Sequence, residues 1–302
     1  MSNMNYTYTF IPYFCFTMRL KKSYNIDELR DYSSLFSRNE ILKLYSNDFT
    51  SIKGKIERYG YTLKKRKQTY LSFLKHAYSI LEKFYPNEYI YKNEFLNKWL
   101  IEKVGLKDSL VYNEFRLGKA VADLVMFNGN SKVFEIKTLL DNDSRLSNQL
   151  KEYSKVFNEV YVVVPYSKLN KYFTLSEKIG LISYNECYSE FNLERKAKIN
   201  LEIDVDILME ILHTKEYLNI VENYFKKKVE CNDFNRFEIC KELMNQIPFN
   251  FLNSEFVRLM KLRRRNNDFS INDKELNQIF LSLNYNIKNR ESLLNNLRTS
   301  IN

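Results

Sequence analysis

The stretch EFRLGKAVADLVMFNGNSKVFEIK, residues 114–137, decides the fold. It contains two apolar, β-branched runs, residues 121–127 and 132–138, separated by Asn128, Gly129 and Asn130. A break of Asn and Gly between two such runs is typical of a tight turn between antiparallel strands. The sequence therefore predicts a β-hairpin at this position.

The predicted hairpin carries charges in an unusual place. Asp123 interrupts the apolar run of the first strand, and Glu135 and Lys137 lie on one face of the second because strand side chains alternate. A buried unpaired charge is costly, so two carboxylates and an ammonium at one sheet favour a divalent cation between them. The alternative for Glu135 and Lys137 is an edge strand with an exposed ion pair.

The spacing of these residues also resembles a known family. Asp123, eleven residues and then Glu135-Ile136-Lys137 is similar to the motif of the PD-(D/E)xK nuclease superfamily, whose members share the restriction-endonuclease-like fold. Gln149 and Tyr153, in a predicted helix beyond the second strand, resemble the Q-x-x-x-Y motif of RecB-like members. The resemblance covers residues 89–184 and is nearest to small bacterial and mobile-element proteins of unassigned role. Ala122 replaces the Pro of the motif.

A second acidic tripeptide, Glu194-Arg195-Lys196, is a weaker match. No strand is expected around it and no Asp precedes it at the motif spacing. Context separates the two tripeptides, and we assign the motif to Glu135 and Lys137.

The resemblance implies an α/β fold with a mixed central sheet, an αβββαβ core and flanking helical regions. It implies a nuclease that hydrolyses phosphodiester bonds with Mg²⁺ or Mn²⁺, held by hard oxygen ligands. Those ligands would be Asp123, Glu135, the Ile136 carbonyl and a helix acid, for which we choose Glu94. Lys137 would position the attacking water and stabilise negative charge, and Gln149 would orient the site.

Composition and charge suggest three successive regions. Residues 1–88 are helical in pattern and carry a net charge of +7, residues 89–190 form the nuclease-like core at +1, and residues 191–302 form a helical domain at +2. The densest basic run is Lys64, Lys65, Arg66 and Lys67. We expect this run to contact phosphates, although a charge run is also compatible with a solvated helix face. Arg116 and Tyr153 are further candidates for nucleic-acid binding.

The remaining elements are predicted from the periodicity of apolar residues and from residues typical of helix ends and turns. Ser37 and Thr62 are candidate helix caps in the N-terminal region, and Gly105 is expected to end a helix over residues 89–104. Further strands are expected at residues 110–117, 160–164 and 181–184. Helices are expected at residues 168–179 and after a cap near residues 141–144, and then at residues 205–212, 215–228, 237–246 and 254–262, followed by a tail of uncertain order.

The composition also excludes some function classes. With only His76 and His213, a zinc protease, a histidine-based triad or an HNH-type nuclease is hard to build. Four cysteines without metal-binding spacing indicate free thiols in a reducing cytoplasm. Residues 1–17 are too short to span a membrane, and two interpretations of them stay open: a first strand, or an extension before a start at Met18.

The expected function is a nuclease acting on nucleic acid, with DNA as the expected substrate. Two other function classes remain as alternatives. One is a nucleic-acid-binding module with an inactive nuclease core. The other is a helical interaction protein of a defence or mobile-element system, whose sheet is only a scaffold. Whether the chain acts as a homodimer is left open by the sequence.

Overall fold

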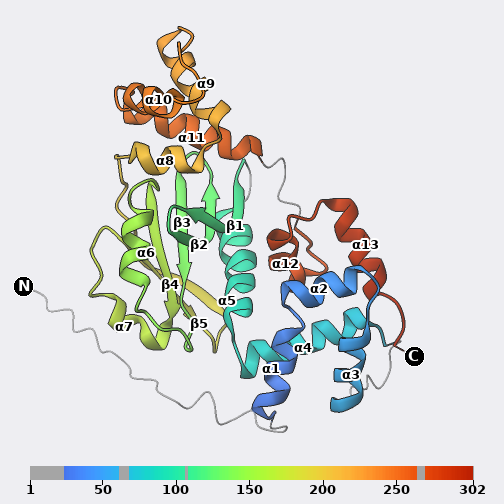
Figure 1. Ribbon diagram of the computed structural model, residues 1–302. Helices are drawn as coiled ribbons and strands as arrows, with labels where there is room; N and C mark the ends of the chain where they lie inside the picture. The colour runs from blue at the N-terminus through green and yellow to red at the C-terminus, as the bar shows by residue number, and fades with distance from the viewer. Residues whose placement is uncertain (1–23, 61–67, 106–107, 264–268, 302) are drawn as a thin grey trace, which may run out of the picture.

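A computed structural model describes residues 24–60, 68–105, 108–263 and 269–301. Their centre is one six-stranded sheet in the order β1-β2-β3-β4-β5-β6 (Figure 1). The pairs β3–β4 and β4–β5 are parallel, and the other neighbours are antiparallel. The strands are β1 (Leu110–Leu117), β2 (Ala120–Phe127), β3 (Ser131–Ile136), β4 (Glu159–Pro165), β5 (Gly180–Asn185) and β6 (Glu190–Arg195). The predicted α/β class with a mixed sheet is confirmed.

The predicted hairpin is formed by β2 and β3. Their register pairs Phe127 with Ser131 and Leu124 with Phe134. In the turn the N–H of Asn128 donates to the carbonyl of Asn130 at 3.0 Å, and Gly129 has a φ of 94° that favours glycine.

Helices cover both faces of the sheet. The chain runs from β3 through α6 (Leu146–Tyr153) into the parallel strand β4, as the βαβ pattern predicts. Val162 and Val164 of β4 share a core with α6, and Val163 shares a core with α5 (Glu88–Glu94) on the opposite face. Burial on both faces explains why β4 is apolar without alternation.

The helix before the sheet changes its winding along its length. α5 continues into a π-helical segment, η2 (Phe95–Val104), and ends at Gly105 with a φ of 82°, as the sequence predicts. Both pieces pack on the sheet face that carries Val163, and Phe95 and Trp99 are buried there.

The N-terminal region is helical, as expected. Its helices are α1 (Ile26–Ser34), α2 (Arg38–Tyr45), α3 (Thr50–Tyr59) and α4 (Tyr70–Phe84). Ser37 caps α2 by accepting the N–H of Glu40. The expected cap of α4 was wrong: Thr69 forms a capping box with Ser72, and Thr62 lies outside the described residues.

The C-terminal region contributes to two cores. α8 (Val205–Ile211), α9 (Thr214–Phe225), α10 (Arg236–Met244) and α11 (Phe249–Arg263) share the core that contains α6. They lie beyond one end of the sheet, at the top of Figure 1. After η4 (Lys274–Leu276), α12 (Asn277–Ser282) and α13 (Ile287–Leu297) pack with the N-terminal helices. The tail is therefore ordered helix in this part, and the expected boundaries at residues 88 and 190 stay predictions about folding units.

Three local expectations were wrong. The expected helix at residues 168–179 is only the short α7 (Leu169–Tyr172), which follows the 3₁₀ turn η3 (Tyr166–Lys168), and the loop after α7 is not helical. The N-cap position of α6 is Arg145, which makes no side-chain capping bond. Glu194 and Arg195 lie in β6, because pairing with β5 makes a strand of a segment without a strong pattern of its own.

No helix within the described ranges is both long and apolar enough to cross a membrane.

Candidate functional site

Asp123 lies where β2 and β3 separate. The register of β2 and β3 ends at the pair Leu124 and Phe134. Beyond this pair, Oδ2 of the Asp123 carboxylate accepts the N–H of Ile136 at 2.7 Å. A strand that loses its neighbour leaves backbone groups without partners, and a buried N–H is costly to leave unpaired. The side chain of Asp123 therefore replaces a ladder bond and is held in place by doing so.

The backbone is irregular at the same place. Ala122 packs in the core on the α6 face, whereas Leu124 packs in the core on the α5 face, so the alternation of β2 breaks at Asp123. On the neighbouring strand β1, Glu114 lies between two residues that pair with Leu124 and Ala122, and its φ is 52°. A non-glycine residue with such a φ stores strain, and strained residues cluster at functional sites.

Glu135 and Lys137 point to the α6 face, on one side of the strand, as the sequence predicts. The Lys137 Nζ lies 2.9 Å from Glu135 Oε1 and 3.4 Å from Gln149 Oε1. Lys137 follows the last residue of β3, and its N–H continues the ladder to the carbonyl of Val163 at 2.8 Å. Both charged side chains are buried, at 2% and 8% exposure, so their pairing is held by the fold.

Tyr153 fixes the other oxygen of Glu135. Its hydroxyl donates to Glu135 Oε2 at 2.7 Å and lies 3.0 Å from the Val121 carbonyl, while Gln149 Nε2 is 3.5 Å away. The side chain is fully buried. Tyr153 therefore orients a carboxylate, and the expected binding of nucleic acid by Tyr153 does not fit this buried placement.

Burial makes the two carboxylates difficult to ionise. Burial raises the pKa of Asp123, and the ammonium of Lys92 opposes the rise. Burial and then the charge of Asp123 raise the pKa of Glu135, against the pull of Lys137. Two desolvated acids that repel each other are stabilised in their charged form by added positive charge. The pair can therefore hold a hard cation through oxygen ligands.

Lys92 is the site residue that the sequence analysis missed. Its Nζ lies 2.8 Å from Asp123 Oδ1 and also binds Glu88, one turn earlier on α5. Burial lowers the pKa of Lys92, but the charges of Asp123 and Glu88 outweigh it and hold the pKa above its usual range. A lysine between the apolar residues Ile90 and Phe95 of a sheet-packing helix was the available signal.

Glu94 is not brought to the site. It accepts the hydroxyl of Tyr78 at 2.5 Å and pairs with Lys98 at 2.6 Å. Two residues along a helix turn the side chain through about 200°, so Glu94 and Lys92 leave α5 in nearly opposite directions. The α5 acid that approaches Asp123 is Glu88, through Lys92.

The expected nucleic-acid contacts are only partly described. Arg116 is exposed on β1, opposite Val121 in the register. Lys64, Lys65, Arg66 and Lys67 lie outside the described residues.

The described ranges contain no group of three or more His, Cys, Asp or Glu side chains that could hold a metal ion. The carboxylates that the candidate site offers to a cation are those of Asp123 and Glu135. The Ile136 carbonyl is a third candidate oxygen donor.

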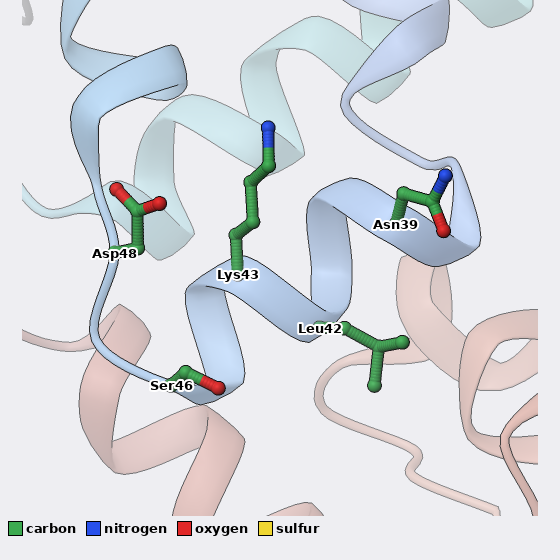
Figure 2. A pocket seen from close by; sticks show the side chains of 5 residues that line it. All are labelled: Asn39, Leu42, Lys43, Ser46 and Asp48. Atoms are coloured by element: carbon green, nitrogen blue, oxygen red, sulfur yellow. The ribbon is translucent and has the colours of Figure 1, made fainter.

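Two shallow hollows lie elsewhere on the surface. One is on α2 and is lined by Asn39, Leu42, Lys43, Ser46 and Asp48 (Figure 2). The other lies between Gly129 and α11, and neither hollow is lined by Asp123 or Glu135.

The model of the family described as Bacteriophage P4 protein cII matches residues 82–285, more than half of the chain. The chain belongs to the Bacteriophage P4 protein cII family. The matched span contains the whole sheet and the residues around Asp123 and Glu135. Protein cII of Enterobacteria phage P4 is 26% identical over 136 residues, which cover 43% of this chain and 51% of that relative. The match thus spans about half the length of the curated cII protein.

Among solved structures, the SPO1766 protein of unknown function from Silicibacter pomeroyi is similar at a TM-score of 0.26 and 14% identity. The match covers 52% of this cII-family chain and 80% of that one.

Proposed function

We propose that the chain is a metal-dependent nuclease that hydrolyses phosphodiester bonds, with DNA as the first substrate to test. The observation that carries the proposal is the placement of Lys137. Its ammonium lies 2.9 Å from the buried carboxylate of Glu135. The partly buried carboxylate of Asp123 acts on Glu135 electrostatically, from the point where β2 and β3 separate. This agrees with the resemblance to the PD-(D/E)xK superfamily.

The residues present fit a divalent cation. Asp123 and Glu135 are carboxylates with raised pKa values, and with the Ile136 carbonyl they form a set of hard oxygen donors, which Mg²⁺ and Mn²⁺ prefer. When bound, such an ion would supply charge neutralisation at the phosphate and a more acidic water.

The chain's own residues would do the rest. Lys137 would donate to the non-bridging oxygens of the reacting phosphate, where negative charge develops, and would position the attacking water. Gln149 holds the Lys137 ammonium at 3.4 Å, and Tyr153 holds Glu135 from the opposite side. A water-poor, preorganised site makes such charge stabilisation more effective than it is in solvent.

A second candidate is a nucleic-acid-binding module with an inactive core. One observation favours it: Asp123 pairs with Lys92 and Glu135 pairs with Lys137, so each carboxylate of the site has a positive partner without an ion. In that case exposed basic residues would account for binding and no bond would be cut.

One experiment separates the two candidates. The purified chain is incubated with linear, circular, single-stranded and branched DNA and with RNA, in Mg²⁺, Mn²⁺ or EDTA, beside Lys137→Ala. Lys132→Ala is the matched control, because it also removes a lysine of the β3 segment that pairs with a buried glutamate. Cleavage that needs the ion and Lys137 but not Lys132 supports the nuclease. Tight binding without cleavage of any substrate favours the binding module.

A further inference from the structure

Every carboxylate oxygen of the candidate site already has one partner. Asp123 Oδ1 is bound by Lys92 and Oδ2 by the N–H of Ile136. Glu135 Oε1 is bound by Lys137 and Oε2 by the Tyr153 hydroxyl. A carboxylate has about four acceptor positions, so each oxygen keeps roughly one for a further ligand. The site is therefore much more restricted than two free carboxylates would be.

Lys92 is firmly placed beside Asp123. Its side chain is only 7% exposed, and its ammonium lies between Asp123 and Glu88, which is 60% exposed at the rim. It comes from α5, on the opposite face of the sheet from Lys137 and α6. The carboxylate pair thus has one lysine on each side.

The pair Lys92–Asp123 differs from an ordinary cross-strand ion pair. Lys132 and Glu159 are direct neighbours in the register of β3 and β4, where pairing helps to hold two strands together. Lys92 instead reaches from a helix to the point where β2 and β3 separate, and it occupies Asp123 Oδ1, one of the four carboxylate oxygens of the site. Its position suits a role in the charge balance of the site.

The charges leave room for little more than one ion. Glu88, Asp123 and Glu135 exceed Lys92 and Lys137 by one negative charge, so one divalent ion would already give the cluster one excess positive charge for a phosphate to offset. Two-ion phosphoryl sites place their ions about 3.5–4 Å apart and clamp both the attacking and the leaving oxygen. Two carboxylates with partly used oxygens, and an ammonium between them and α5, do not offer a second such place.

We propose that the site takes a single divalent cation and that the Lys92 ammonium stands in place of a second one beside Asp123. The inference rests on the proposed metal-dependent function. Lys92 is then a positioning residue that holds Asp123 and, as a fixed positive charge near the ion, weakens the affinity of the site for that ion.

Calorimetric titration of the full chain with Mn²⁺ and with Mg²⁺ tests the stoichiometry. One ion per chain is expected, and binding should be lost in Asp123→Asn and Glu135→Gln. Two ions per chain would overturn the inference and leave the nuclease proposal standing. No binding by the parent would remove the metal from the proposal and the inference with it.

Neutral variants test the charge of Lys92. Lys92→Gln can still donate to Asp123, and Lys92→Met cannot; both should bind Mn²⁺ about tenfold more tightly, since a like charge a few ångströms from a divalent ion is removed. Lys92→Arg keeps the charge and should bind like the parent. Lys132→Met is the control for loss of a partly buried ion pair, and its Mn²⁺ affinity should not change.

Circular dichroism shows which variants fold, and Lys92→Gln carries the test if Lys92→Met does not. Equal or weaker Mn²⁺ affinity in a folded neutral variant, with one ion still bound by the parent, would overturn the role of Lys92 alone.

Discussion

The hydroxyl of Tyr153, in the last turn of α6, donates a hydrogen bond to Glu135 Oε2 at 2.7 Å. A helix therefore orients a carboxylate on strand β3. The same helix presents Gln149 one turn earlier, which holds Lys137. Residues at i and i+4 lie on one face of a helix. The docking of α6 on the sheet therefore sets the positions of both Glu135 and Lys137.

Tyr153→Phe should remove one hydrogen bond to a charged group without creating a cavity. We expect a loss of about 1.5 to 3 kcal/mol in the free energy of unfolding, together with weaker Mn²⁺ binding. Tyr161→Phe is the matched control, because Tyr161 donates to Glu159 at the same 2.7 Å outside the site. Urea unfolding and calorimetry provide the measurements. A loss of Mn²⁺ affinity in both variants would argue against an orienting role specific to Tyr153.

Lys137→Ala should reduce cleavage by about 10²- to 10³-fold, because a preorganised donor to developing charge is lost. Much of the affinity for nucleic acid should remain. Asp123→Asn and Glu135→Gln should behave similarly, and two changes together should cost little more than one, since groups acting as a unit are not additive. Gln149→Ala should be milder, because water can replace an orienting amide. Single-turnover cleavage is the measurement, and wild-type rates in all these variants would refute the nuclease.

Removal of divalent ions should abolish cleavage reversibly. The candidate ligands are carboxylates without a His or Cys cluster in the described part of the chain, so Mg²⁺ or Mn²⁺ should restore activity after EDTA. Tightly held zinc should not be required, which elemental analysis of the active protein can check. Full activity in EDTA would contradict this prediction.

Stability without divalent ions should depend on the ionisation of Glu135. Burial and the charge of Asp123 raise the pKa of Glu135 in the folded state, so the folded protein holds this proton more tightly than the unfolded chain. The contribution of Glu135 to stability should therefore fall as pH rises from about 4, the usual carboxyl pKa, and level off above the raised value.

Glu135→Gln cannot ionise and is the reference for this effect. The difference in unfolding free energy, parent minus variant, should fall with increasing pH, measured by urea titration from about pH 4 to 8. A difference that rises with pH would mean that Lys137 outweighs burial.

The basic run before α4 can be tested without a description of its structure. Changing Lys64, Lys65, Arg66 and Lys67 to Gln should weaken binding to all nucleic-acid sequences alike. Each lost phosphate contact should reduce the slope of log affinity against log salt by about one. Changing Lys226, Lys227 and Lys228 to Gln removes three positive charges from another basic run and is the control for a general effect of lowered net charge. An unchanged slope would assign the run to a solvated helix face.

The sequence alone determined the hairpin and most of the charged cluster. Apolar, β-branched runs around an Asn/Gly break are local signals, and they place Asp123 and Glu135 on adjacent strands. Gln149 and Tyr153 were accessible for the same reason, because helical spacing puts them on one face. These predictions needed only the geometry of single elements and of neighbouring strands.

Tertiary structure decided the rest. Whether Glu94 or Lys92 meets Asp123 depends on how α5 is rotated about its axis against the sheet, and the apolar residues on both sides of that helix leave the rotation open in the sequence. The packing of α12 and α13 on the N-terminal helices joins segments far apart in the chain. Such contacts form because they bury apolar surface across the whole fold, and no local window of sequence contains both partners.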